Sequence, residues 1–511
     1  MQAVQIRNHS FRFKAALSTL VWACFLCFST SVVVAQDLQA QVRRKITGTE
    51  LAKASFTAVA LDPSDGRVLF SFNPQQALIP ASNMKLLTSG AALMVLGPDF
   101  AFETRIDAAG DRILLVGSGD PAFGDPVILN RSQPPLTIED LLTQLVGAVK
   151  QRGPKTISEV IVDDRVFDRE FVHSSWPIEQ LNLWYCAEVG GVNVYTNVLA
   201  FYPRPAPEGA GSPLYTVEPR VPWIEFQNNA RTVTTGRQTF WIARPQRKNE
   251  FSLRGDVRSS GAEAARVAIH NPPLFTGQLL AERLASSGAS IGSAGRTGVQ
   301  AVRLAELDER FEGAVPIAIV KTPLIDVLER CNTQSHNLYA EALIKRIGHA
   351  VTSEPGTWSN GAAVIRSLIS ERLGPDHASR TRIADGSGMS RENRVSAETL
   401  AAWLIEVSKN DRVYREMLTS LAKPGEGTLR TRFQGTSVAN NIYAKSGYLN
   451  GVRGLSGYVV APNGQQVVFA MIMNDIPSSV STQSRVFMEE VVLMIDGWLA
   501  DRAIDRPAYG G

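Results

Sequence analysis

The sequence contains few of the residues that hold metal ions or close disulfides. Among 511 residues there are 6 histidines and 4 cysteines, and no H-E-x-x-H motif occurs. Scattered histidines without such a pattern predict neither a metal site nor a cofactor. Cys24 and Cys27 lie in an N-terminal apolar segment, which leaves Cys186 and Cys331 for a processed chain. An oxidising compartment would allow these two to pair, but two isolated buried thiols are the preferred interpretation.

A strong excess of charge is also absent. The formal net charge is +3, and Arg7, Arg12 and Lys14, which precede the first acid at Asp37, account for all of it. A chain that is neutral beyond this segment has no electrostatic basis for binding nucleic acid. The content of 44% hydrophobic and 20% charged residues is ordinary for a globular protein. The length predicts two or three domains, because one small core cannot serve so long a chain.

The only long apolar run lies at the N-terminus. Three basic residues precede residues 15–34, which are apolar apart from small polar side chains, and Val33-Val34-Ala35 is a small-residue cleavage pattern. We therefore predict a signal peptide over residues 1–35, cleaved after Ala35, and a protein exported to the periplasm. An uncleaved membrane anchor is the alternative, which the serines and threonines of the run disfavour. Peripheral contact with a membrane stays open.

Local patterns in the first and last thirds of the chain predict one α/β unit. Residues 56–61 and 68–72 are β-prone runs around a turn, and residues 453–461 and 465–473 flank a Pro-Asn-Gly turn, so two hairpins are expected. Residues 84–96 are apolar on nearly every face, which is typical of a buried helix. Helical periodicity is found in four further segments, which are residues 323–330, 335–347, 396–407 and 484–499.

The middle of the chain has a different texture, with short strand-like runs, helical stretches and a part rich in Pro, Gly, Arg and Thr. We therefore predict an insertion with a second, β-rich domain nested inside it. The predicted boundaries are 36–101 and 316–505 for a discontinuous catalytic domain, 102–202 and 272–315 for the inserted domain, 203–271 for the nested domain, and 506–511 for a tail.

The sequence also has no G-x-S-x-G motif, so it gives no support for a histidine-activated serine nucleophile. A serine hydroxyl is a poor nucleophile unless a nearby base takes its proton. The motif Ser82-Asn-Met-Lys85 supplies such a base, because a serine at a helix start and a lysine one turn later lie on the same helix face. Burial can lower a lysine pKa enough for it to act as that base. A second S-x-x-K motif, Ser420-Leu-Ala-Lys423, is followed directly by Pro-Gly, which predicts a helix end there. The alternative to a nucleophile is a structural role for Ser82, in which its side chain caps the start of the helix.

Two further short motifs follow in the chain. Ser335-His-Asn337 opens a predicted helix, where simple capping is the structural alternative. Lys445-Ser446-Gly447 is the only K-[ST]-G and lies on an apparent strand, where a surface bulge is the alternative. A strand edge can pair with an extended peptide, a lysine and a hydroxyl can hold its carboxylate, and glycine permits close approach.

The order S-x-x-K, S-x-N, K-[ST]-G resembles the penicillin-recognising serine hydrolases. Segments 117–121, 185–197 and 385–391 make the chain similar to the low-molecular-mass class C penicillin-binding proteins, the D-alanyl-D-alanine carboxypeptidase/endopeptidases, over residues 51–498. The resemblance implies an α/β (α+β) penicillin-binding/β-lactamase-like transpeptidase domain, with an antiparallel sheet flanked by helices and two nested insertions. The long interval between Ser82 and Ser335 fits this family.

The resemblance also implies roles for individual residues. Ser82 would attack the substrate carbonyl, Lys85 would act as general base, and Ser335 would pass the proton to the leaving group, assisted by Lys445. Asn337 would hold the substrate amide. Residues expected to bind substrate are Ser446, where the family usually has threonine, Gly447, Tyr448, Asp163, Arg391 and Asn450. The backbone N–H groups of Ser82 and Tyr448 would form the oxyanion hole.

The function implied is hydrolysis of D-alanyl bonds in peptidoglycan stem peptides, with β-lactams acylating Ser82. A secreted serine β-lactamase is one alternative, which the large insertion disfavours. A non-catalytic peptidoglycan-binding protein on the same fold is another, which has no need of Lys85. The balance between trimming terminal D-alanine and cutting cross-links stays open, as does the oligomeric state.

Overall fold

The computed structural model describes residues 38–505 apart from residues 208, 210, 262 and 294. The predicted signal peptide and the predicted tail lie outside the described residues. Among the described helices, none is long and apolar enough to cross a membrane. Both cysteines in the described part, Cys186 and Cys331, are buried and free, so the preferred interpretation of two isolated thiols is confirmed.

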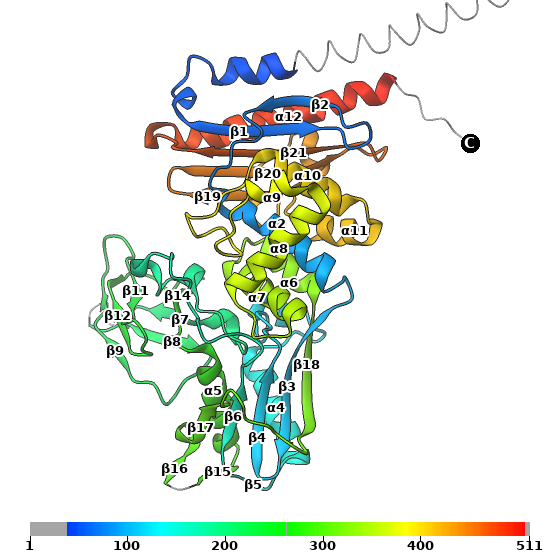
Figure 1. Ribbon diagram of the computed structural model, residues 1–511. Coiled ribbons are helices and arrows are strands. Elements are labelled where there is room, and N and C mark those ends of the chain that lie inside the picture. Colours follow the sequence, from blue (N-terminus) through cyan, green and yellow to red (C-terminus); the bar gives the residue numbers. More distant parts are fainter. Residues whose placement is uncertain (1–37, 208, 210, 262, 294, 506–511) are drawn as a thin grey trace, which may run out of the picture.

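The upper part of the molecule in Figure 1 is built on a five-stranded antiparallel sheet with the order β19-β20-β21-β1-β2. Its strands are β1 (Ser55–Leu61), β2 (Val68–Phe72), β19 (Ile442–Leu449), β20 (Val452–Val460) and β21 (Gln466–Asn474). Both predicted hairpins are confirmed, because β1 pairs with β2 and β20 with β21. Strands β1 and β21 also pair, so the two ends of the chain form one sheet.

Helices cover both faces of this sheet, as the family resemblance implied. Helix α12 (Ser481–Asp505) packs on one face through residues such as Val491 and Ile495. On the other face lie α2 (Met84–Val95), α6 (Leu324–Asn332), α7 (Asn337–Thr352), α8 (Trp358–Leu373), α9 (Pro375–Ser379), α10 (Ala397–Ser408) and α11 (Asp411–Ser420). Helix α2 is surrounded by this layer, and its residues from Met84 to Leu93 are all buried. This explains why its sequence has no polar face.

The lower part contains a second, mixed sheet with the order β17-β6-β4-β3-β18. Its strands are β3 (Ala101–Ala109), β4 (Arg112–Gly117), β6 (Val160–Asp163), β17 (Val302–Leu304) and β18 (Val315–Pro323). Helices α4 (Ile138–Arg152) and α5 (Pro272–Ser286) share a hydrophobic core with it. Because β18 pairs with β3 along its length, we propose that the chain returns to the upper part after Pro323 rather than at residue 316.

Smaller sheets form the lobe on the left of Figure 1. They comprise β7 (Val198–Arg204), β8 (Leu214–Glu218), β9 (Phe226–Asn228), β10 (Arg231–Thr232), β11 (Trp241–Ala243), β12 (Phe251–Arg254), β13 (Asp256–Val257) and β14 (Ala265–Ala268). Besides the 3₁₀ turns, the remaining short elements are α3 (Pro126–Leu129), β5 (Thr156–Ile157), β15 (Ser290–Ser293) and β16 (Arg296–Thr297). Since β7 belongs to this lobe, we propose that the nested part begins near Val198. Its core is continuous with that of the second sheet.

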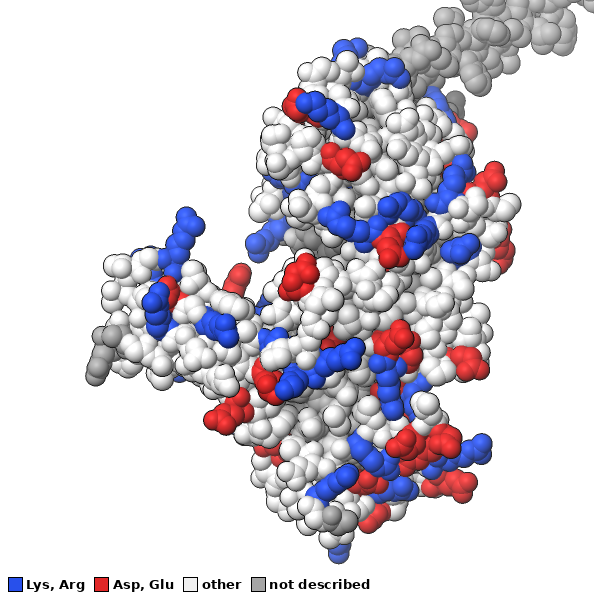
Figure 2. Space-filling view, turned by 60° about the vertical axis from the view of Figure 1, so that its left-hand side comes forward, with Lys and Arg blue, Asp and Glu red and all other residues white. Residues whose placement is uncertain are grey.

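Charged side chains of both signs lie interspersed on the face shown in Figure 2, most densely over the end that the second sheet forms. The second sheet has ion pairs between its charged side chains, such as Arg303 with Glu159 and with Glu309. A mixed surface of this kind produces no long-range field of one sign over this face.

Candidate active site

Ser82 lies at the entrance of α2, in a single 3₁₀ turn (Ala81–Asn83) that runs directly into the helix. Its side chain is half-buried, whereas the flanking residues Ala81 and Asn83 are fully buried. Ala81 has a left-handed φ of 48°, which is unusual for a residue with a side chain. A Cβ at Gly388 would lie 1.8 Å from the carbonyl oxygen of Ala81, so the glycine-containing loop closes tightly against the turn.

Lys85 is buried one turn after Ser82, and its ammonium nitrogen is surrounded by oxygen acceptors. Nζ donates to the carbonyl of Ser387 at 2.9 Å, to Oδ1 of Asn337 at 2.8 Å and to Oγ of Ser82 at 3.2 Å. The first two acceptors have no proton to give. An uncharged amine would therefore keep its two hydrogens on them and direct its lone pair at the Ser82 hydroxyl.

The electrostatics around Lys85 favour this uncharged form. Burial lowers the pKa of Lys85, and the acidic groups Cys331, Glu341 and Asp385, which would attract the ammonium only in their ionised forms, do not cancel that shift. A lysine whose pKa is lowered toward the working pH can accept a proton, as a general base must.

Ser335 is brought to the same place from the loop before α7. Its backbone is left-handed, with φ of 58°, and its hydroxyl is half-buried. Lys445 donates from Nζ to Ser335 Oγ at 2.9 Å and to the carbonyl of Ser446 at 2.8 Å. Burial, and then the charge of Lys85, lower the pKa of Lys445 well below its usual value. The three predicted motifs thus meet around Ser82, Ser335 and the two lysines.

Asn337 is the first residue of α7 and joins the site to the inserted part of the chain. Its Oδ1 accepts from Lys85, and its Nδ2 donates to the carbonyl of Tyr185 at 2.9 Å. Tyr185 lies in a short turn (Trp184–Cys186) of the insertion. The same nitrogen donates its second hydrogen to Met389 Sδ at 3.7 Å, and a thioether is a weak acceptor that a substrate carbonyl can replace.

Strand β19 forms the edge of the sheet beside Ser82 and carries Lys445, Ser446, Gly447 and Tyr448. The N–H of Ala444 points away from β20, to the carbonyl of Ala422 at 3.1 Å. Because strand residues alternate in direction, the N–H groups of Ser446 and Tyr448 point the same way. A Cβ at Gly447 would lie 3.1 Å from the backbone nitrogen of Ser82, so a glycine permits this close approach.

The sequence reasoning missed Glu341, which is fully buried on α7. Its carboxylate accepts from the N–H groups of Gly386 and Ser387, each at 2.9 Å, and from Nε1 of Trp358 at 2.8 Å. Burial, and then the charge of Asp385, raise its pKa to about 7. The available signal was its position four residues after Asn337, which places both side chains on one face of the helix.

Arg391 and Asn450 contact each other at the end of β19. Arg391 donates from Nη2 to the carbonyl of Asn450 at 2.6 Å, and both residues are exposed. The structure therefore brings these two predicted substrate contacts together from separate loops, at the same end of the strand as Tyr448.

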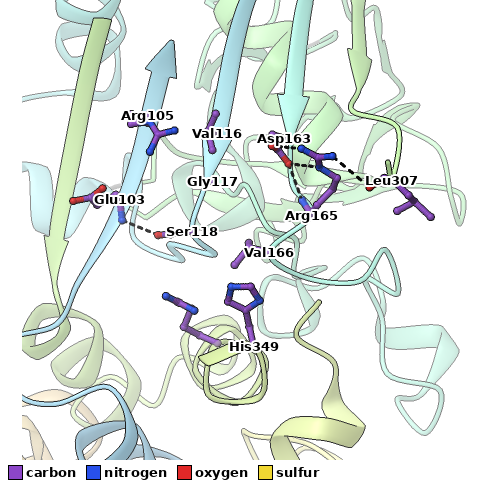
Figure 3. A pocket seen from close by; sticks show the side chains of 11 residues that line it. Glu103, Arg105, Val116, Gly117, Ser118, Asp163, Arg165, Val166, Leu307 and His349 are labelled. Carbon is purple, nitrogen blue, oxygen red and sulfur yellow. Dashed lines mark hydrogen bonds and ion pairs between the residues drawn. The ribbon is translucent and has the colours of Figure 1, made fainter. Parts of the chain in front are cut away.

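Asp163 lies in a different part of the molecule. It ends β6 and lines a cavity of about 490 Å³ together with Arg165 and His349 (Figure 3). His349 is near the C-terminal end of α7, about 18 Å along the helix from Asn337 at ~1.5 Å per residue. Asp163, which the resemblance implied as a contact of the substrate, thus lies near the end of α7 that is remote from Asn337, so any contact with substrate there would be distant from Ser82.

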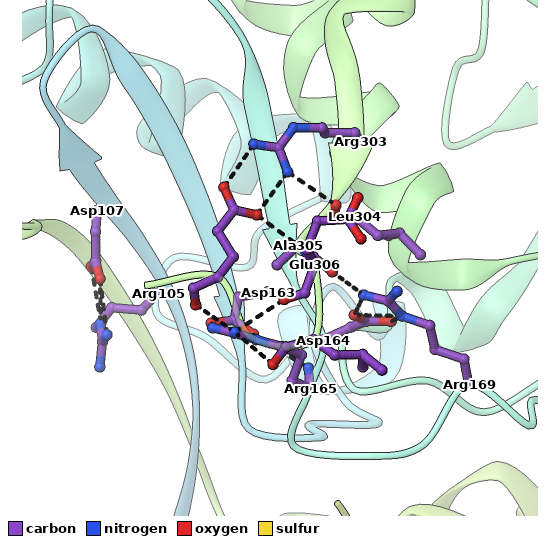
Figure 4. A network of polar contacts seen from close by, with 12 residues as sticks. Arg105, Asp107, Asp163, Asp164, Arg165, Arg169, Arg303, Leu304, Ala305 and Glu306 are labelled. Carbon is purple, nitrogen blue, oxygen red and sulfur yellow. Dashed lines mark hydrogen bonds and ion pairs between the residues drawn. The ribbon is translucent and has the colours of Figure 1, made fainter. Parts of the chain in front are cut away.

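The carboxylate of Asp163 is already occupied there. Arg165 donates to it from Nε at 2.8 Å and from Nη2 at 2.7 Å. Figure 4 shows this pair within a network that also contains the pair of Asp164 with Arg169. The network ties the ends of the strands in the second sheet together.

This fold and this site, with a serine and two buried lysines meeting between a helical layer and the edge of an antiparallel sheet, define a serine hydrolase of the penicillin-recognising class. The D-Ala-D-Ala carboxypeptidase 3 (S13) family matches residues 38–493, and the chain belongs to this family. The family predicted from the three motifs together with segments 117–121, 185–197 and 385–391 is thereby confirmed, as is the prediction that the chain is an enzyme.

Two relatives and one solved structure illustrate the similarity. The D-alanyl-D-alanine carboxypeptidase of Actinomadura sp. (strain R39) is 31% identical over 442 residues, which cover 81% of this chain and 77% of that protein. The D-alanyl-D-alanine carboxypeptidase DacB of Haemophilus influenzae is 22% identical over 425 residues, covering 81% and 84%. The structure of penicillin binding protein 4 from H. influenzae superposes with a TM-score of 0.69 at 19% identity, covering 91% of this chain and 98% of that one. The predicted fold class is confirmed.

Proposed function

We propose that the chain is a serine-type D-Ala-D-Ala carboxypeptidase and DD-endopeptidase that acts on peptidoglycan stem peptides through an acyl-enzyme on Ser82. The observation that carries this proposal is the placement of Lys85 Nζ, 3.2 Å from Ser82 Oγ, with its other two contacts to oxygens that can only accept. This is the arrangement that a serine nucleophile with a lysine base requires.

Acylation follows from the contacts. Lys85 takes the proton of Ser82 as Oγ attacks the carbonyl of the D-alanyl bond, and the N–H groups of Ser82 and Tyr448 stabilise the oxyanion. Ser335 relays this proton to the departing nitrogen, because it gives up its own proton and regains the one that Lys85 took up, while Lys445 stabilises the Ser335 oxygen from 2.9 Å. The C–N bond breaks, and an ester to Ser82 remains. Water then hydrolyses the ester and regenerates the hydroxyl.

The substrate would lie extended along β19. The outward groups of Ser446 and Tyr448 can add it to the sheet edge as a further strand. Gly447 permits the approach, and Asn337 Nδ2 exchanges its weak contact with Met389 Sδ for a hydrogen bond to a substrate carbonyl. Arg391 and Asn450, at the end of the strand, would contact the donor stem peptide. The proposal does not include Asp163 among the residues that contact substrate.

The setting proposed for this reaction is the periplasm, reached through cleavage of residues 1–35. The proposed partners are peptidoglycan stem peptides and β-lactams. Each contains a carbonyl group that the Ser82 hydroxyl can attack. The proposal assigns no metal, cofactor or nucleic acid to the site and no oligomeric state to the chain.

The test is mass spectrometry of the purified protein after treatment with penicillin. We expect a stable adduct on the peptide that contains Ser82, absent in Ser82→Ala and retained in Ser420→Ala. The latter removes the serine of the second S-x-x-K and is a matched control. An adduct that survives in Ser82→Ala would refute the assignment, and an adduct lost within seconds would indicate a β-lactamase instead.

A further inference from the structure

A cavity of about 660 Å³ lies next to the loop that contains Ser335. The residues on either side of this serine, Gln334 and His336, both line it. The opposite wall comes from the inserted part of the chain, with Trp184 and Arg266 among its residues. The Ser335 hydroxyl itself is directed to Lys445. The cavity thus begins one residue from the group that protonates the leaving nitrogen.

Among the residues that line the cavity, His336 gives the strongest indication of a ligand. Its side chain is only 6% exposed, and its Nδ1 is buried without a hydrogen-bond partner among the described residues. Burial, reinforced by the charge of Arg330, lowers the pKa of His336 to about 3, so the ring is neutral at neutral pH. Its ring packs against Trp184 and Tyr339, with centroids 5.6 Å and 5.0 Å away. A buried polar atom without a partner costs free energy unless a ligand satisfies it.

Three charged side chains line the cavity near His336, and two of them, Arg330 and Glu218, already have partners. Arg330 is held by Asp125 at 2.8 Å, and Glu218 accepts from the hydroxyl of Tyr195 at 2.8 Å. Arg266 is exposed, and within the described part of the chain its side chain has no hydrogen bond or ion pair. Trp184 is 39% exposed and offers an apolar face nearby. A free guanidinium beside an aromatic surface suits a peptide that bears a carboxylate.

We infer that this cavity is a subsite for the leaving strand of a cross-linked substrate, a peptide whose free carboxylate Arg266 binds and whose chain lies against Trp184 and His336. The inference rests on the proposed function. The position beside Ser335 places the cavity on the leaving-group side of the bond. A free alanine, the leaving group in carboxypeptidase cleavage, would leave most of this volume empty, whereas a stem peptide fills it.

The experiment compares a monomeric pentapeptide muropeptide with a cross-linked dimer, for wild type, Arg266→Ala and Trp184→Ala. We expect kcat/KM for the dimer to fall about tenfold in each variant, with the monomer rate and the rate of penicillin acylation unchanged. Matched controls are Arg237→Ala and Trp241→Ala, which remove exposed residues outside the cavity, in the lobe that contains Arg266. A dimer whose leaving-strand carboxylates are amidated should be a poor substrate for wild type and no poorer for Arg266→Ala.

Equal loss on monomer and dimer, or no loss on either, would overturn the subsite. These outcomes differ from a failure of the proposed function, in which wild type itself neither hydrolyses the muropeptides nor forms the penicillin adduct. The acylation rate also serves as the check that each variant is folded.

Discussion

Glu341 is joined to Lys85 through the backbone of a single residue, Ser387. The N–H of Ser387 donates to Oε1 of Glu341 at 2.9 Å, and the carbonyl of Ser387 accepts from Lys85 Nζ at 2.9 Å. The buried acid therefore acts on the base in two ways. It holds the loop that positions the amine, and its negative charge raises the pKa of Lys85 against the effect of burial.

Glu341→Gln should move the pH dependence of acylation. Without the negative charge the pKa of Lys85 falls further, so the uncharged amine persists to lower pH. We expect the acid limb of the profile of penicillin acylation against pH to shift toward lower pH. The control is Glu371→Gln, an exposed residue of α8. An acid limb that stays in place or moves to higher pH would contradict the role assigned to Glu341.

The same variant should change how stability depends on pH. The pKa of Glu341 is raised to about 7 in the folded protein, above its value of about 4.3 in an unfolded chain. The folded state therefore binds the extra proton between these values, and this contribution to stability is lost as pH rises through that window. In urea denaturation, wild type should lose stability relative to Glu341→Gln from pH 4.5 to 7. The opposite trend would show that the folded pKa is not raised.

Lys85→Arg should abolish most of the activity, because a guanidinium stays charged and cannot accept the proton of Ser82. Loss of a general base lowers rates by about 10²–10⁴-fold, which is the fall expected in the rate of penicillin acylation. Lys423→Arg, in the second S-x-x-K, should leave the rate unchanged, since Lys423 is exposed and lies over the ring of Tyr443. A residual rate near that of wild type in Lys85→Arg would remove Lys85 as the base.

Gly388→Ala should displace the turn that carries Ser82. The added Cβ would lie 1.8 Å from the carbonyl oxygen of Ala81, and Gly388 has a left-handed φ of 83°. We expect a large loss of penicillin acylation together with a lower free energy of unfolding. Gly464→Ala is the matched control, because φ there is 84° with open space around it, so it tests backbone strain alone. Equal effects in the two variants would show that the contact with Ala81 is unimportant.

Asp163→Asn should leave catalysis intact. Its carboxylate binds Arg165 near the far end of α7, so kcat/KM for muropeptides and the rate of acylation should match wild type. The free energy of unfolding should fall by no more than about 1 kcal/mol, which is usual for a partly exposed ion pair. A selective rise in KM would instead mean that the cavity of Figure 3 contacts substrate.

Local properties of the chain could be predicted from the sequence. The hairpin of β20 and β21 follows from two apolar runs around Asn463-Gly464, and α2 from an apolar run behind Ser82. Both depend on turn chemistry and periodicity, which act over a few residues. The three motifs, taken in order, indicated the penicillin-recognising class, and segments 117–121, 185–197 and 385–391 narrowed it to the family.

Only the tertiary structure decided which distant groups meet. Lys85 and Asn337 are 252 residues apart in the chain, and Lys445 and Ser335 are 110 apart. Their contacts, the buried place of Glu341 and the position of Asp163 away from the nucleophile depend on how helices and sheets pack against one another. Packing sums many small contacts between segments far apart in the chain, and no short stretch of sequence contains that sum.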